Sequence, residues 1–233
     1  MNKAAFKQYW PWGLMAFLAI AVTLVAVAPY VTLNPANFNN ATARYAHETP
    51  IRYAGLFVHA FSSGLALLLG PFQFLKGLRQ RRPNLHRWMG RLYLVGILLG
   101  GVSALVIAPG IISGLVGQIG LSMLGVLWLV TGWMAYASIR AGNVTAHREW
   151  MTRSFALTFA AVTLRLWLGI LIGTQIPSLQ TAYHGDFNAL FVEAYRVVMW
   201  LCWVPNLIVA EWIIQRRRAP QAAVRETHAF SEA

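Results

Sequence analysis

Residues 86–91 read HRWMGR and lead into an apolar run over residues 91–109. A close variant, HREWMTR, occupies residues 147–153 and precedes a second apolar run over residues 154–175. Runs of about 20 apolar residues are typical of transmembrane helices. Basic and aromatic residues beside such a run are typical of the membrane surface. The two His-Arg phrases therefore mark the start of two membrane-spanning helices on one face of a membrane.

The composition of the whole chain agrees with this reading. Of the 233 residues, 58% are hydrophobic and only 11% are charged, whereas a soluble domain carries about 25% charged residues. We predict an all-α membrane protein with a bundle of about six transmembrane helices in one domain, residues 1–218, and a disordered tail over 219–233. The predicted spans cover residues 11–31, 53–75, 91–109, 115–139, 154–175 and 190–214, the first being retained rather than cleaved.

The basic residues predict the orientation of this bundle. With six spans, most of the 19 Lys and Arg residues fall on one side of the membrane. The positive-inside rule makes that side cytoplasmic, with both the N and C termini on it, in the bacterial inner membrane. The net charge of +12 is then a topology signal, so we expect no nucleic-acid partner. The expected partners are the lipid bilayer and anionic head groups at the cytoplasmic face.

The doubled phrase has two interpretations. It indicates a parallel internal repeat, in which the third and fourth spans correspond to the fifth and sixth, and such repeats often enclose a site. Alternatively, the phrase recurs because each basic helix start was selected independently. The sequence leaves both interpretations open.

The histidines of the two phrases are candidate haem ligands. A b-type haem needs two axial ligands at one depth on facing helices, and His86 and His147 meet that condition. Arginines beside them would pair with the haem propionates, and these are Arg87, Arg91, Arg148 and Arg153. The alternative is that all of these side chains only anchor helix ends to phosphate head groups. We expect no metal site other than a haem iron.

A second group of polar residues lies within the predicted spans, toward the opposite face. Ionisable groups inside a membrane are costly and usually functional. At a rise of about 1.5 Å per residue, His59 and Arg165 reach similar depths, and Ser63 lies one turn from His59. Glu193 and Arg196 lie one turn apart near the outer end of the sixth span, so all four ionisable residues could meet in one cavity. We predict an outward-facing anion or quinone site there, with His59 also a candidate haem ligand. The alternative is a structural ion-pair network of Arg165, Glu193 and Arg196.

Three stretches carry a resemblance to a known family. Residues 70–74 (GPFQF), 82–93 (RPNLHRWMGRLY) and 147–154 (HREWMTRS) resemble a bacterial family of multipass inner-membrane proteins of unknown function. The likeness covers roughly residues 53–215 and implies a helical membrane protein with no settled activity. The layout is also loosely similar to that of cytochrome b561-like and ferric-reductase-like proteins, which hold haem b between paired histidines. This chain departs from them by lacking a second clear histidine pair.

The sequence supports three functional hypotheses. The leading one is an electron-transfer protein that binds haem b or a quinone. The second is a transporter, or a lipid- or anion-binding protein, whose site is the outward-facing Arg/Glu/His group. The third is an accessory subunit without chemistry that packs against another membrane protein. Phosphate-binding loops, HExxH and GxSxG motifs are absent from the sequence, and no catalytic residue is assigned.

Overall fold

The chain is built from helices alone over the part that the structure describes. The computed structural model describes the backbone of residues 3–231 and the side chains of residues 10–219. In chain order the elements are α1 (Lys3–Val31), η1 (Pro35–Asn37), η2 (Ala43–His47), α2 (Pro50–Gln73), α3 (Lys76–Arg81), α4 (Pro83–Ile107), η3 (Ala108–Gly110), α5 (Gly114–Arg140), α6 (Val144–Thr158), α7 (Ala160–Gln175), η4 (Ile176–Ser178), α8 (Leu179–Ala182), α9 (Phe187–Leu201) and α10 (Val204–Ser231). The prediction of an all-α protein is confirmed.

Six stretches within the described range are long and apolar enough to cross a membrane, as predicted. They are Trp10–Val31, Pro50–Gln73, Pro83–Gly110, Gly114–Arg140, Val144–Ala182 and Phe187–Ala219. Many large apolar side chains on them face outward, such as Phe17, Val25 and Trp133, each about two-thirds exposed. An apolar outer surface of this kind suits a lipid environment.

Two helices begin earlier than the hydropathy pattern predicts. α4 begins at Pro83 and α6 at Val144, so both His-Arg phrases lie inside the first turns of their helices. Proline is favoured at the first position of α4, and the Asn143 side chain caps α6 by accepting a hydrogen bond from the Ala146 amide at 2.9 Å. Hydropathy detects the apolar stretch rather than these starts.

The last helix, α10, continues through Ser231, whereas the sequence predicted a disordered tail from residue 219. Alanine is frequent in this stretch and favours helix. Residues 232–233 of the predicted tail lie outside the described residues.

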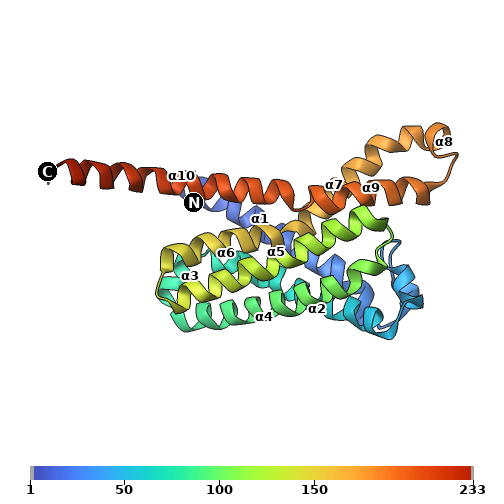
Figure 1. Cartoon of the computed structure of the whole chain (residues 1–233), viewed down its shortest axis with the longest axis horizontal. Helices are drawn as coiled ribbons and strands as arrows, with labels where there is room; N and C mark the ends of the chain where they lie inside the picture. Colours follow the sequence, from blue (N-terminus) through green and yellow to red (C-terminus); the bar gives the residue numbers. More distant parts are fainter. Residues whose placement is uncertain (1–2, 232–233) are drawn as a thin grey trace.

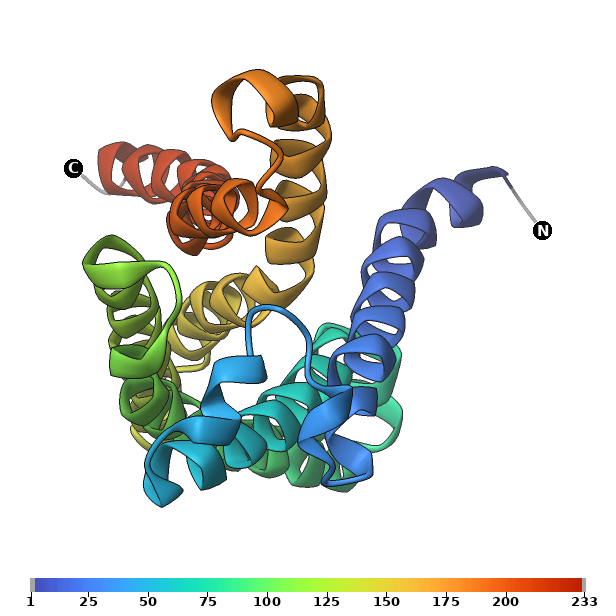
Figure 2. The same cartoon turned by 90° about the vertical axis from the view of Figure 1, so that its right-hand side faces the viewer.

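The two ends of the bundle differ in what they carry (Figure 1). One end, here called the α3 end, holds α3, the turn between α5 and α6, and both ends of the described chain. The other, the α8 end, holds α8, η3 and the segment that joins α1 to α2. Seen from the α8 end, that segment crosses in front of the bundle (Figure 2). The arginine-rich α3 end is the one that the sequence predicts to be cytoplasmic.

Helices α2 and α4 pack closely enough that their backbones nearly touch. A Cβ atom at Gly96 of α4 would lie only 2.9 Å from the carbonyl oxygen of Ser62 on α2. One at Gly100 would lie 2.7 Å from the Ser63 Oγ. Small residues at helix crossings allow such approach in membranes, so the glycines of α4 permit the close packing of this pair.

The fifth and sixth spans are both broken near their middle. The fifth changes from α6 to α7 at Phe159, and the sixth changes from α9 to α10 at Cys202 and Trp203. Asn206 joins the two breaks, because its Nδ2 donates to the carbonyl oxygens of Ala156 at 3.0 Å and Cys202 at 2.9 Å. Thr163 Oγ1 also donates to the Cys202 carbonyl, at 2.6 Å. Carbonyls freed by a break in a membrane helix need partners of this kind.

A buried polar cluster lies in the core where α4, α5 and α6 meet. The Tyr93 hydroxyl is hydrogen-bonded to Thr158 Oγ1 at 2.8 Å and to Ser154 Oγ at 3.1 Å. Trp128 Nε1 donates to the same Thr158 oxygen at 2.9 Å. The cluster therefore ties α4, α5 and α6 together and pairs polar groups that would otherwise be costly in the core.

Candidate functional site

A large cavity opens at the α3 end, between the end of α2, the short helix α3 and helices α4, α5, α6 and α10. We call it the His–Arg cavity, and its volume is about 940 Å³. The charged and imidazole side chains that line it are Arg79, His86, Arg87, Arg91, Arg140, His147, Arg148, Glu149, Arg217 and Arg218. Both histidines of the two sequence phrases therefore line one cavity, together with Arg87, Arg91 and Arg148.

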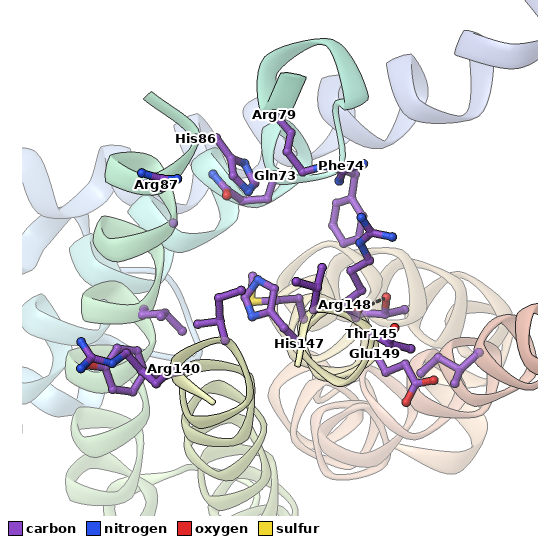
Figure 3. Close-up of a pocket in the computed structure, with 18 of the residues that line it drawn as sticks. Gln73, Phe74, Arg79, His86, Arg87, Arg140, Thr145, His147, Arg148 and Glu149 are labelled. Carbon is purple, nitrogen blue, oxygen red and sulfur yellow. Dashed lines mark hydrogen bonds between the residues drawn. The ribbon is translucent and has the colours of Figure 1, made fainter. Parts of the chain in front are cut away.

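His86 and His147 occupy equivalent places on two helices. Each is the fourth residue of its helix, α4 or α6. Their amides are hydrogen-bonded to the equivalent preceding carbonyls, Arg82 at 3.1 Å and Asn143 at 3.0 Å. Figure 3 shows the two imidazoles extending into the cavity from α4 and from α6. Both imidazoles therefore lie at the same end of the bundle, in one cavity.

The hydrogen bonds show which ring nitrogen of His147 carries the hydrogen in the neutral form, but they do not show this for His86. His147 Nδ1 lies 2.8 Å from the carbonyl oxygen of Ala135. Because a carbonyl can only accept, Nδ1 carries the hydrogen and the neutral ring keeps a lone pair on Nε2. Among the described residues, the buried Nδ1 of His86 and the buried Nε2 of Gln73 have no hydrogen-bond partner. Gln73 is only 8% exposed, so its amide nitrogen is a buried donor without a hydrogen-bond acceptor among the described residues.

The charge of this cavity is strongly positive. Seven arginines line it against one carboxylate, Glu149. Glu149 forms an ion pair with Arg218, whose Nε lies 2.6 Å from Glu149 Oε1. Among the described residues, none of the other lining arginines forms an ion pair with a carboxylate. The arrangement therefore attracts an anion.

Arg153 does not take part in this cavity, although the sequence predicted it as a propionate partner. Its guanidinium forms a two-point ion pair with Glu211 on α10, with Nη2 and Oε2 2.9 Å apart. It also lies 4.5 Å from the ring of Trp150. The second phrase has one extra residue, Glu149, and one residue rotates the following positions by about 100° around a helix. The matching Arg91 of the first phrase does line the cavity.

A second cavity, of about 510 Å³, lies deeper in the bundle toward the α8 end. We call it the His59–Arg165 cavity, and it contains His59, Ser63 and Arg165 from the second predicted group. His59 Nδ1 lies 2.9 Å from the Gly100 carbonyl oxygen, so it donates there and leaves Nε2 with a lone pair. Arg165 Nη1 donates to the carbonyl oxygen of Ala161 at 2.6 Å.

Glu193 and Arg196 do not join this cavity. Both are exposed on α9. Glu193 accepts a hydrogen bond from the Tyr183 hydroxyl at 3.1 Å, and Arg196 Nε donates to the Ser113 carbonyl oxygen at 3.3 Å. The structural network of Arg165, Glu193 and Arg196 considered from the sequence is therefore not formed. Within the described residues, Arg165 has no carboxylate partner.

The segment between α1 and α2 closes the α8 end of the second cavity. Residues 39–42 and Tyr45 line the cavity, and the Tyr45 hydroxyl donates to the Ile107 carbonyl oxygen at 2.8 Å. Burial raises the pKa of Tyr45 to about 12, so it stays a donor at neutral pH. Glu48 joins this segment to the start of α2, because its carboxylate forms ion pairs with Arg52 of α2 at 2.7 Å and with Arg44 of η2 at 3.4 Å. The hydrogen bond from Arg52 lowers the pKa of the Glu48 carboxyl.

This lowered pKa predicts that acid loosens the segment. The stabilisation is fully present above the ordinary carboxyl pKa of about 4.3 and is lost as the pH falls through the lower folded value. In wild type, amide hydrogen exchange over residues 39–48, corrected for the intrinsic rate, should therefore be constant from pH 7 to about pH 5 and rise below about pH 4. Glu48→Gln should exchange faster already at pH 7 and show no acid step. An unchanged acid step in Glu48→Gln would assign it to another group.

The structure adds site residues that the sequence did not indicate. Gln73, Arg79, Arg140 and Arg217 join the His–Arg cavity from four different elements. Only Gln73 had a local signal, because it lies in the GPFQF stretch. The described residues contain no group of three or more His, Cys, Asp or Glu side chains placed to hold a metal ion.

The comparisons with known proteins identify a family and nothing more specific. The model of a family described as "Predicted membrane protein (DUF2306)" matches residues 56–214, which is more than half of the chain. No curated protein and no solved structure matches the chain. The resemblance to a membrane family of unknown function is confirmed, whereas the loose likeness to cytochrome b561 has no support.

Proposed function

We propose that this chain, which belongs to the DUF2306 family of predicted membrane proteins, binds haem b in the His–Arg cavity and serves electron transfer. The observation that carries the proposal is the pair His86 and His147, placed at equivalent positions of α4 and α6 and directed into one cationic cavity. Bis-histidine ligation from two helices is a standard arrangement for haem b.

The details of the cavity fit this group. Histidines that bind a metal usually donate their second ring N–H to a carbonyl or carboxylate, and His147 does so with the Ala135 carbonyl. Arg87, Arg91 and Arg148 supply guanidinium groups for two propionates. Apolar side chains such as Leu94 and Met151 complete the lining. Bound haem would supply one-electron redox chemistry, while the protein orients the imidazoles and neutralises the propionates.

The orientation in the membrane forms part of the same proposal. The arginines of the His–Arg cavity belong to the basic cluster that the positive-inside rule assigns to the cytoplasm. We therefore propose that the cavity opens on the cytoplasmic side of the bacterial inner membrane. Electrons would then enter or leave the haem near that surface.

A second candidate, a phosphate-bearing lipid head group, is favoured by one observation. The cavity has seven arginines, more than two propionates require, and the Gln73 amide is an additional buried donor without a partner. Phosphate oxygens accept several such hydrogen bonds at once. This ligand would use the arginines and Gln73 and would not need two imidazoles.

The absorption spectrum tests the haem proposal. Protein purified from iron-replete cells, or reconstituted with hemin, should show a Soret band and a sharper α band after dithionite reduction. His86→Ala and His147→Ala should each weaken haem binding by at least about tenfold, because each removes an axial ligand. His47→Ala is the matched control, since His47 lies in η2 at the α8 end, and it should retain the full spectrum.

The same preparations separate the two candidates. If wild-type protein shows no Soret band after reconstitution, the haem proposal is wrong. Native mass spectrometry should then detect a retained phospholipid that Arg148→Gln releases and His147→Ala does not. A Soret band that persists in both histidine variants would move the iron ligands away from the His–Arg cavity.

A further inference from the structure

Arg165 is a cation placed inside a membrane span without an anionic partner. It belongs to α7, and its guanidinium donates a hydrogen bond to the carbonyl oxygen of Ala161, one turn earlier along the chain. The residues that line the His59–Arg165 cavity include no Asp or Glu. His59 uses its Nδ1 hydrogen on the Gly100 carbonyl, so a neutral imidazole leaves the cavity with a single positive charge. A charge held in this way within a span normally marks a ligand or an ion path.

The rest of the cavity suits an apolar body rather than a small hydrated ion. Apart from Arg165, the lining is largely apolar and includes Leu121, Leu124, Leu164, Leu168 and Phe191. Its volume of about 510 Å³ lies within the ~300–1,000 Å³ typical of sites for small organic molecules. Chloride or free phosphate would leave most of this apolar space unfilled.

Helices α1 and α7 form two walls of this cavity. The two helices pack near the middle of the bundle, where Ala19 and Val162 belong to one buried cluster. Beyond that contact they diverge, and at the α8 end they lie on opposite sides of the bundle (Figure 2). Ala26 and Tyr30 of α1 and Leu168 of α7 line the cavity in this diverging part. Both helices therefore form walls of the cavity where they separate, next to the surface that the bundle presents to lipid.

We propose that the His59–Arg165 cavity binds an amphiphile with one anionic head, a carboxylate or a phosphate monoester, and one long apolar chain. The head pairs with the Arg165 guanidinium, and the chain lies against the leucines of α5 and α7. This site is separate from the His–Arg cavity and does not depend on haem. An uncharged quinone would fill the apolar space but leave the Arg165 charge unpaired, which is costly inside a membrane.

The test measures the binding of defined probes to the full-length chain in nanodiscs of zwitterionic lipid. The probes are palmitate labelled with ¹³C at the carboxyl carbon, hexadecyl phosphate, uncharged hexadecanol and decylubiquinone. Palmitate or hexadecyl phosphate should bind at least about tenfold more tightly than hexadecanol, because only they form a charged hydrogen bond with Arg165. Whichever anionic probe binds more tightly identifies the head group.

Variants locate the site. Arg165→Gln should weaken binding of the anionic probe about tenfold to hundredfold, and Arg165→Lys should restore part of it because the charge returns. Arg196→Gln is the matched control, since Arg196 is an exposed arginine on α9 outside the cavity lining, and it should bind as wild type does. Ala60→Phe, which fills the cavity from α2, should also abolish binding. The haem content should be the same in every variant that folds.

Two results would overturn the proposal. One is that hexadecanol or decylubiquinone binds to the wild-type protein as tightly as the anionic probes do. That result would mean that the Arg165 charge has no role in binding. The other is unchanged palmitate and hexadecyl phosphate binding in both Arg165→Gln and Ala60→Phe. If Arg165→Gln fails to fold, the comparison of charged with uncharged probes on wild type, together with Ala60→Phe, still decides the question. Loss of the haem spectrum alone would overturn only the function proposed for the other cavity.

Discussion

Asn206→Leu is expected to lower the free energy of unfolding by about 2–3 kcal/mol and the thermal midpoint in detergent by about 5–10 °C. A single hydrogen bond between membrane helices contributes only about 0.6 kcal/mol on average. Asn206, however, donates to two carbonyls at the breaks of two spans and contacts Thr163 Oγ1 at 3.0 Å. Leucine would leave the Ala156 carbonyl without this partner in a water-poor interior, and that loss is the larger part of the effect.

The same chemical change at an exposed position serves as the control. Asn188 lies in the first turn of α9 and is exposed, so Asn188→Leu should shift the midpoint by less than about 2 °C. Asn206→Leu with a midpoint equal to that of wild type would mean that the broken spans are held together by packing alone. Thermal unfolding followed by tryptophan fluorescence measures all three proteins in one detergent.

Gly96→Val is expected to have an even larger effect and to prevent recovery of well-folded protein. An added Cβ would lie 2.9 Å from the Ser62 carbonyl oxygen and 3.2 Å from the Ala66 Cβ. The first atom belongs to the backbone of α2 and cannot rotate away. Overpacking of a core usually costs about 1–3 kcal/mol, and displacement of a whole helix should exceed that range. Size-exclusion chromatography in mild detergent should show aggregate in place of a single peak.

A glycine in open space provides the control for helix propensity. A Cβ at Gly169 of α7 would meet no atom within 4 Å, so Gly169→Val should behave as wild type on the same column. A single wild-type peak for Gly96→Val would show that α2 and α4 can separate without loss of the fold.

The sequence predicted the architecture well because hydropathy depends only on local composition. The six apolar runs required six spans, and the two His-Arg phrases led to the two histidines of one cavity. The helix starts were missed by up to ten residues at Val144, because a basic amphipathic turn continues the helix beyond the apolar run. The break at Cys202 had one signal in the sequence, Pro205, which has no N–H to donate within α10. The break at Phe159 had none.

The second group of residues shows what depth alone cannot predict. Counting residues along the spans placed Arg165, Glu193 and Arg196 in the outer part of the bundle but gave no information on the direction that each side chain faces. Because α7 and α9 each adjoin a break, the direction of their faces depends on tertiary contacts that join distant parts of the chain. Arg165 consequently lines the cavity, whereas Glu193 and Arg196 are exposed. Arg153 also lies outside the cavity that was predicted for it, but there the cause is local: the extra residue Glu149 turns Arg153 toward Glu211.

The wall that α10 contributes to the His–Arg cavity has a consequence for biogenesis. Ile214, Arg217 and Arg218 line the cavity from α10, and the pairs with Glu149 and Arg153 fasten this helix to α6. α10 follows every other wall of the cavity along the chain, so it is the last to leave the ribosome and to be inserted. While translation is in progress the cavity stays open on that side. A ligand that needs all of its walls is therefore captured only after synthesis of the sixth span, which makes loading a late step of maturation.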